Sequence, residues 1–162
     1  MSIRNALGWL LVPTLLMVFP AIIGCTPKNK ISEDPKVRLN EYISKSFAVR
    51  GAADRNDLMD YLTGDARKRL KNWSDDQFRQ AFIDSKRQFL KLSFREVKPV
   101  SQTQSDITYE ITYLSQNKDT GHETKITNRK LAEMILDQGK WMITDVRNLK
   151  ELVEYSNELT LP

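Results

Sequence analysis

The hydrophobic pattern changes its period near Leu90, and this change constrains the fold more than any other feature of the sequence. Before it, apolar residues recur every three or four positions, which is typical of one face of an α-helix. After it, Leu90, Leu92 and Phe94 alternate with polar residues, as in a strand with one buried face. Helices followed by strands predict an α+β domain in which the helices cover one face of a sheet.

Two helices are expected at the start of the domain. The first begins at Asp34-Pro35, because aspartate caps a helix and proline fits its first position. Gly51 ends it. The second covers about residues 56–72, and Gly64 is expected to bend or divide it.

A third helix has the clearest beginning. Ser74-Asp75-Asp76-Gln77 is a capping box, in which serine and glutamine cap each other's backbone and two acids face the positive helix end. The apolar stripe expected on this helix consists of Phe78, Ala81, Phe82, Ser85 and Phe89.

Four strands joined by short turns are expected after the helices. They cover, in order, residues 90–99, 107–113, 123–136 and 140–147. Short turns between consecutive strands predict an antiparallel meander. Leu149, Leu152 and Val153 predict a short C-terminal helix that completes a single domain over residues 35–162.

This order of elements resembles the cystatin-like cone of the nuclear-transport-factor-2-like superfamily. The resemblance covers residues 34–147 and includes Gly139-Lys140-Trp141, the start of the closing strand, which recurs in such domains. It implies three helices packed into the concave face of a strongly curved four-stranded sheet. It also implies a cavity that holds an apolar ligand in some members and an Asp–His pair in enzymes.

The first 24 residues are typical of an export signal. Arg4 gives a basic start, and residues 6–24 contain no charge. The segment ends in Ile22-Ile23-Gly24-Cys25, which resembles the lipobox of bacterial lipoproteins. The resemblance implies cleavage between Gly24 and Cys25 and a lipid anchor on Cys25, with acyl chains such as palmitate that hold the protein to the bilayer.

An uncleaved transmembrane anchor is the alternative, since 19 apolar residues approach the roughly 20 that span a bilayer. Pro13 and Pro20 would interrupt such a helix, and this interpretation leaves Cys25 unexplained. We therefore predict a lipoprotein with a flexible tether over residues 25–34. Thr26, where enteric lipoproteins of the inner membrane carry aspartate, favours the periplasmic face of the outer membrane.

The composition excludes several function classes. One cysteine and one histidine in 162 residues provide neither an internal disulfide nor a Cys/His zinc site, so no metal and no cofactor are expected. The formal charge of +4, about +3 after loss of Arg4, is too low for the dense basic face of a nucleic-acid binder. We therefore expect no nucleic-acid partner.

Acid–base catalysis is not expected. His122 lies in a polar turn, and no Ser-His-Asp set is evident. Glu110 alternates with buried residues and should face solvent, and no carboxylate has surroundings that indicate a shifted pKa. The carboxylates considered for acid–base roles are Asp57, Asp60, Asp75, Asp76 and Glu110. No catalytic residue is therefore predicted.

Two groups of side chains are candidates for binding. Aromatic residues could line a pocket between the helices and the sheet, although core packing is the favoured explanation because they lie on stripes that must be buried in any case: Tyr61, Trp73, Tyr109, Tyr113 and Trp141. A basic run could contact anionic lipid, although a solvated helix face is the favoured explanation: Arg67, Lys68, Arg69 and Lys71.

These observations predict a membrane-anchored envelope lipoprotein whose domain binds a protein partner or small ligand and is not an enzyme. One alternative is a cone-fold enzyme of the polyketide-cyclase or isomerase kind. Another is a structural accessory of an envelope assembly or secretion system.

Overall fold

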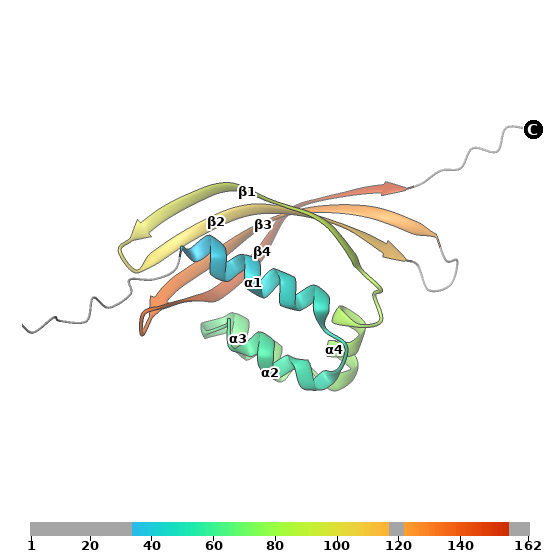
Figure 1. Ribbon diagram of the computed structural model, residues 1–162, viewed down its shortest axis with the longest axis horizontal. Coiled ribbons are helices and arrows are strands. Elements are labelled where there is room, and N and C mark those ends of the chain that lie inside the picture. Colours follow the sequence, from blue (N-terminus) through green and yellow to red (C-terminus); the bar gives the residue numbers. More distant parts are fainter. Residues whose placement is uncertain (1–33, 117–121, 156–162) are drawn as a thin grey trace, which may run out of the picture.

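The structure, a computed structural model, describes residues 34–116 and 122–155. The described helices are α1 (Pro35–Ala48), the 3-10 turn Ala52–Asp54, α2 (Arg55–Met59), α3 (Gly64–Asn72) and α4 (Asp75–Phe82). The strands are β1 (Gln88–Ser101), β2 (Gln104–Gln116), β3 (Glu123–Asp137) and β4 (Lys140–Tyr155). All helices precede the sheet, as Figure 1 shows, which confirms the predicted α+β class. The export signal, Cys25 and most of the tether lie outside the described residues.

Two of the predicted helix beginnings are confirmed by their caps. The Asp34 carboxylate accepts a hydrogen bond of 2.9 Å from the backbone N–H of Lys36 at the start of α1. At α4, the Ser74 hydroxyl accepts from the Gln77 N–H at 3.2 Å, and the Gln77 side chain accepts from the Ser74 N–H at 2.9 Å. Local side-chain chemistry therefore determines where these helices start.

The second predicted helix is divided, so the described part of the chain has four α-helices where three were expected. Gly64 begins α3 with a φ of +53°, a backbone conformation that glycine adopts readily. Just before it, the chain crosses to the sheet, where the Thr63 N–H donates to the Ile143 carbonyl and the Ile143 N–H donates to the Tyr61 carbonyl. Pairing with β4 therefore replaces helical hydrogen bonds in this segment.

The stripe predicted for the third helix is too long. Helix α4 ends at Phe82, and Lys86 has a φ of +40°, which turns the chain toward the sheet. Phe89 consequently lies in β1, opposite Tyr113 of β2. The helical spacing of Phe89 from Phe82 is therefore coincidental.

The predicted C-terminal helix is wrong, because Leu149, Leu152 and Val153 belong to β4. Val153 lies opposite Ile126 and Leu152 opposite Thr127 in the β3–β4 ladder. Leu149 is an extra residue of β4 at the register shift between the Arg129–Lys150 and Lys130–Asn148 pairs. A bulge of this kind breaks the alternation of faces and produces a spacing that resembles a helix.

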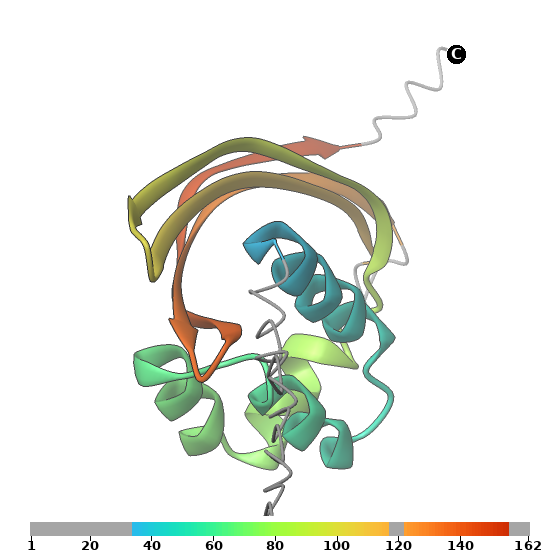
Figure 2. The ribbon, with the colours of Figure 1, turned by 60° about the vertical axis from the view of Figure 1, so that its left-hand side comes forward.

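The strands form one open antiparallel sheet in the order β1-β2-β3-β4, which confirms the predicted meander. The sheet is strongly curved, and α1 lies inside its concave side with the other helices beyond it (Figure 2). The core fills the space between them, with Leu39 and Ile43 of α1 packed together with Phe78, Ile107 and Ile143. No helix within the described ranges is long and apolar enough to span a membrane.

Candidate functional site

A cavity of about 400 Å³ lies between α1, α4 and the concave face of the sheet. Its polar lining consists of Tyr42, Ser46, Arg87, Tyr109, Tyr113, Lys130 and Asn148. Its apolar lining consists of Ile43, Phe47, Trp73, Ala81, Phe82, Ile111 and Val146. A cavity of this volume, with apolar and polar side chains in equal number around it, can hold a small molecule.

Arg87 enters the cavity from the segment between α4 and β1. Its guanidinium lies 5.0 Å from the Phe47 ring centroid and 5.5 Å from that of Phe82. The Nε and Nη2 atoms are shielded from solvent, and neither has a hydrogen-bond partner among the described residues. Burial lowers the pKa of the Arg87 side chain, although arginine stays charged at neutral pH.

Lys130 is the second cation of the cavity. It lies on β3, directly between Tyr109 of β2 and Asn148 of β4, and therefore faces the concave side. Burial is the main cause of its lowered pKa, and the positive charge of Arg87 lowers it further, whereas Glu151 has an opposing effect. Arg87 is thus close enough to Lys130 to disfavour the charge of the lysine.

Three tyrosines add hydroxyl groups to the site. Burial raises the pKa of Tyr42, Tyr109 and Tyr113, so all three stay protonated at neutral pH. The Tyr113 hydroxyl accepts a hydrogen bond of 3.3 Å from the Asn128 amide. Its own proton therefore remains able to serve another acceptor.

No carboxylate is among the described residues that line the cavity. Glu151 lies opposite Asn128 in the β3–β4 ladder and is exposed. Glu110 is on the convex face, as expected, where Arg95 and Arg129 bind its carboxylate. These two arginines lower the pKa of Glu110, a shift that the sequence around Glu110 did not indicate.

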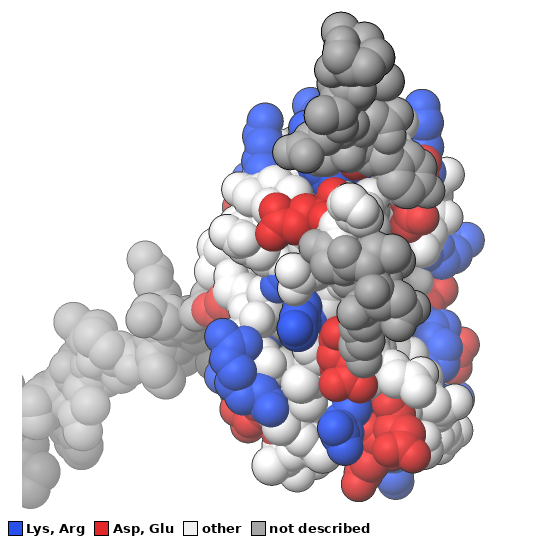
Figure 3. Space-filling model, turned by 90° about the vertical axis from the view of Figure 1, so that its right-hand side faces the viewer, with Lys and Arg blue, Asp and Glu red and all other residues white. Residues whose placement is uncertain are grey.

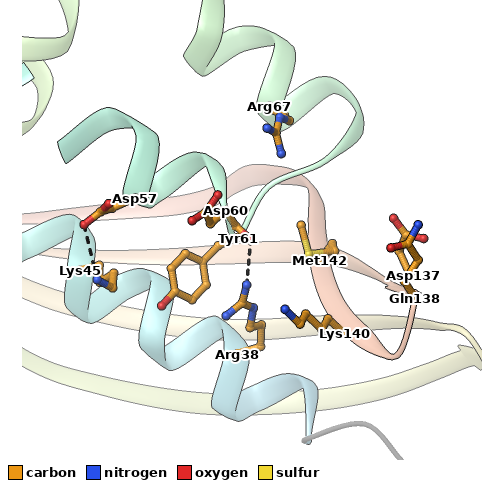
Figure 4. Close-up of a pocket in the computed structure, with 10 residues that line it drawn as sticks. All are labelled: Arg38, Lys45, Asp57, Asp60, Tyr61, Arg67, Asp137, Gln138, Lys140 and Met142. Carbon is orange, nitrogen blue, oxygen red and sulfur yellow. Dashed lines mark hydrogen bonds and ion pairs between the residues drawn. The ribbon is translucent and has the colours of Figure 1, made fainter. Parts of the chain in front are cut away.

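A second, more open groove of about 580 Å³ lies outside the sheet arch, between α1, α2, α3 and the β3–β4 turn (Figure 4). Arg38 lies 3.9 Å from the Tyr61 ring centroid and donates a hydrogen bond of 2.8 Å to the Asp60 carbonyl. Arg67 donates to the Met59 carbonyl at 3.2 Å. These cations already hold the α2–α3 segment in place, so the groove has a structural explanation.

The predicted aromatic residues fall into three environments. Trp73, Tyr109 and Tyr113 line the cavity, whereas Tyr61 lines the open groove. Trp141 is buried in the core and lines neither space. Of the five aromatic residues predicted to line a pocket, three therefore line the cavity and two do not.

The predicted basic run does not form one free positive surface. Arg69 pairs with Asp145, and Lys68 lies 3.3 Å from Asp65. Lys71, like the other three residues of the run, is exposed. On the molecular face drawn in Figure 3, positive and negative side chains are likewise interspersed.

The remaining predicted candidates do not assemble into a site. His122 is exposed, just before β3. Asp75 pairs with Arg55 at 2.8 Å, and Asp57 lies 3.7 Å from Lys45. Over residues 34–116 and 122–155, no group of three metal-ligating side chains is present.

Sequence reasoning missed the two cations of the cavity. A signal for Lys130 existed, because it shares the inward register of Asn128, Ala132 and Met134 on β3. A charged residue at an inward position of a strand is unusual unless it has a partner or a role. Arg87 offered no such signal, since it lies in a connecting segment.

Comparison with known proteins shows the fold but no family. No family model matches the chain, and no curated protein matches it. Among solved structures it is similar to the crystal structure of the intermembrane space region of the chloroplast protein ARC6, with a TM-score of 0.51 and 16% identity. The match covers 72% of this chain and 97% of that one, and at this identity it bears on the fold alone.

Proposed function

We propose that this chain is a lipoprotein of the bacterial cell envelope, anchored through Cys25 at the periplasmic face of the outer membrane. Its domain, a cystatin-like cone, binds a small ligand without converting it. The cavity of about 400 Å³ between the helices and the concave face carries this proposal. It combines aromatic rings that can pack against a ligand with polar groups that can orient it.

The polar lining favours binding over turnover. A cone enzyme with an Asp–His pair needs a carboxylate and an imidazole in the cavity, and the described lining provides lysine, arginine and tyrosine side chains. These groups donate hydrogen bonds at neutral pH and so can orient a ligand. We therefore place the alternative enzyme and structural-accessory roles behind ligand binding.

Cavity binding is tested with the neutral probe 2-naphthamide and the full chain in a nonionic detergent. We expect isothermal titration to detect binding, and Ala81→Phe to weaken it because the larger side chain fills the cavity. Ala48→Phe is the matched control, since Ala48 is exposed on α1. Equal binding by all three proteins would place the probe outside the cavity and contradict the proposal.

Anchoring is tested separately by Cys25→Ser in the native host. We expect the wild-type protein in the membrane fraction, with Cys25 carrying diacylglycerol and acyl mass. The variant should be released or left unprocessed, and Thr26→Ser should behave like the wild type. Mature native protein with an unmodified Cys25 would refute the lipoprotein assignment.

A further inference from the structure

The cavity holds positive charge without a matching anion. Arg87 and Lys130 both line it, and no described carboxylate does. Each charge is partly removed from water, and burial of a charge is unfavourable unless the charge is paired. The residues around the site therefore leave positive charge that a bound anion can pair with.

We propose that Arg87 and Lys130 form an anion site that holds the carboxylate or phosphate group of a small ligand, while the aromatic walls hold the ligand's apolar part. This inference rests on the proposed ligand-binding function and specifies its chemistry. The ligand class is thus a small amphipathic anion.

The geometry of Arg87 supports this assignment. Its Nε and Nη2 atoms, the two without partners, lie on the same edge of the guanidinium. That edge binds two oxygen atoms of one carboxylate or phosphate group. Arg129 uses the same edge on the convex face, where its Nε and Nη2 lie 2.9 and 2.7 Å from Oε1 of Glu110.

The other titratable groups near the site do not cancel its charge. Glu151 is the acid that acts on Lys130 and Tyr113, but it is exposed and does not line the cavity. Arg69 acts on Tyr42, but it is paired with Asp145 and adds little net charge to the site. The tyrosine hydroxyls are protonated donors, and donors of this kind also favour an anion.

The walls determine which anion fits. The rings of Phe47, Phe82 and Tyr113 surround the Arg87 guanidinium at 5.0 to 5.9 Å, and Trp73 adds another aromatic surface. An inorganic anion would use only the cations and would make no apolar contact with these rings. A carboxylate or phosphate joined to an aromatic or aliphatic body uses both parts of the cavity.

The test compares 2-naphthoate and 2-naphthyl phosphate with the neutral 2-naphthamide, by isothermal titration of the full chain in nonionic detergent. For the wild type, we expect at least one anion to bind about tenfold tighter than the amide, a factor that corresponds to one charge-assisted interaction. Arg87→Met and Lys130→Met should each weaken anion binding more than amide binding, so that the ratio of the two affinities falls toward one. The tighter of the two anions identifies the headgroup.

Matched controls remove charge elsewhere. Arg79→Met changes an exposed arginine on α4, and Lys150→Met changes an exposed lysine on β4 opposite Arg129, and both should keep the anion preference. If Arg87→Met does not fold, Arg87→Lys replaces it. That variant keeps the charge and loses the two-donor edge, so it should weaken anion binding severalfold.

The outcomes separate the inference from the function on which it rests. Equal affinity of wild-type protein for amide and anions, unchanged by Arg87→Met or Arg87→Lys, overturns the anion site and leaves cavity binding intact. Failure of every probe to bind the wild type overturns both.

Discussion

Replacement of Lys130 by methionine should stabilise the ligand-free domain. Methionine keeps most of the apolar stem of lysine and removes an ammonium group that lies in the cavity beside Arg87. Replacement of buried ion pairs by apolar groups is often neutral or stabilises proteins by roughly 1–4 kcal/mol, and a buried cation without a paired anion has less attraction to lose. Because Lys130 keeps some exposure, we expect the lower part of this range, about 1–2 kcal/mol. At about 3–5 °C per kcal/mol for a domain of this size, the Tm should rise by about 3–10 °C.

The pH dependence identifies the cause of this gain. The pKa of Lys130 is lowered by burial and by Arg87, so just below the unfolded value near 10.4 the unfolded chain binds more protons than the folded one. The stability of the wild type should therefore rise with pH in this range relative to that of Lys130→Met. The difference in free energy of unfolding between the two proteins should become smaller from pH 7 to pH 10. The tyrosines whose pKa is raised act equally in both proteins and cancel in this comparison.

The assay is thermal unfolding followed by circular dichroism at pH 7, 8.5 and 10 without ligand. Lys150→Met is the control, because Lys150 is exposed and lies opposite Arg129. It should change stability by less than about 0.5 kcal/mol. A Lys130→Met protein that is no more stable than the wild type at pH 7, or a gap that stays constant to pH 10, would refute the reasoning.

Two further predictions concern the scaffold. Phe78→Ala should lower the free energy of unfolding, measured by denaturant titration, by about 3–5 kcal/mol, because the Phe78 side chain is fully buried against Phe82. Phe89 is 44% exposed, so Phe89→Ala should lower the free energy of unfolding clearly less. Gly64→Ala should lower the free energy of unfolding by about 1 kcal/mol, because a side chain is unfavourable at its φ of +53°. A steric clash is not the cause, since the new Cβ would lie 3.6 Å from the Thr144 carbonyl oxygen. Gly51→Ala, with a φ of −151° and open space around it, should be neutral or slightly stabilising, and an equal loss at both glycines would contradict the conformational explanation.

The order of elements could be predicted because its signals are local. The caps at Asp34 and Ser74 act within three residues, and the alternation in β2 needs no information from elsewhere. The end of β4 could not be predicted in this way. Its apolar spacing depends on a bulge at Leu149, and only pairing with β3 shows that the segment is a strand.

The candidate site could be predicted less well than the order of elements, because it depends more on long-range contacts. Trp73, Tyr109 and Tyr113 were predictable because aromatic residues on buried stripes must meet between helices and sheet. Arg87 lies outside any periodic segment, and its position over the Phe47 ring results from the path of the chain between α4 and β1. No spacing in the sequence relates Arg87 to Lys130, which lies 43 positions later.

Positive side chains are paired with a carboxylate on the convex face of the sheet but not in the cavity on its concave face, and this contrast supports the anion proposal. On the convex face, Glu110 of β2 binds Arg129 of β3 and Arg95 of β1, so cations and anion are provided together. On the concave face, the adjacent residue Lys130 and the nearby Arg87 lack such a carboxylate among the cavity-lining residues described. Burial of a charge is unfavourable unless the charge is paired. An anion that arrives from outside would pair the two cations of the cavity and therefore best explains this difference between the faces.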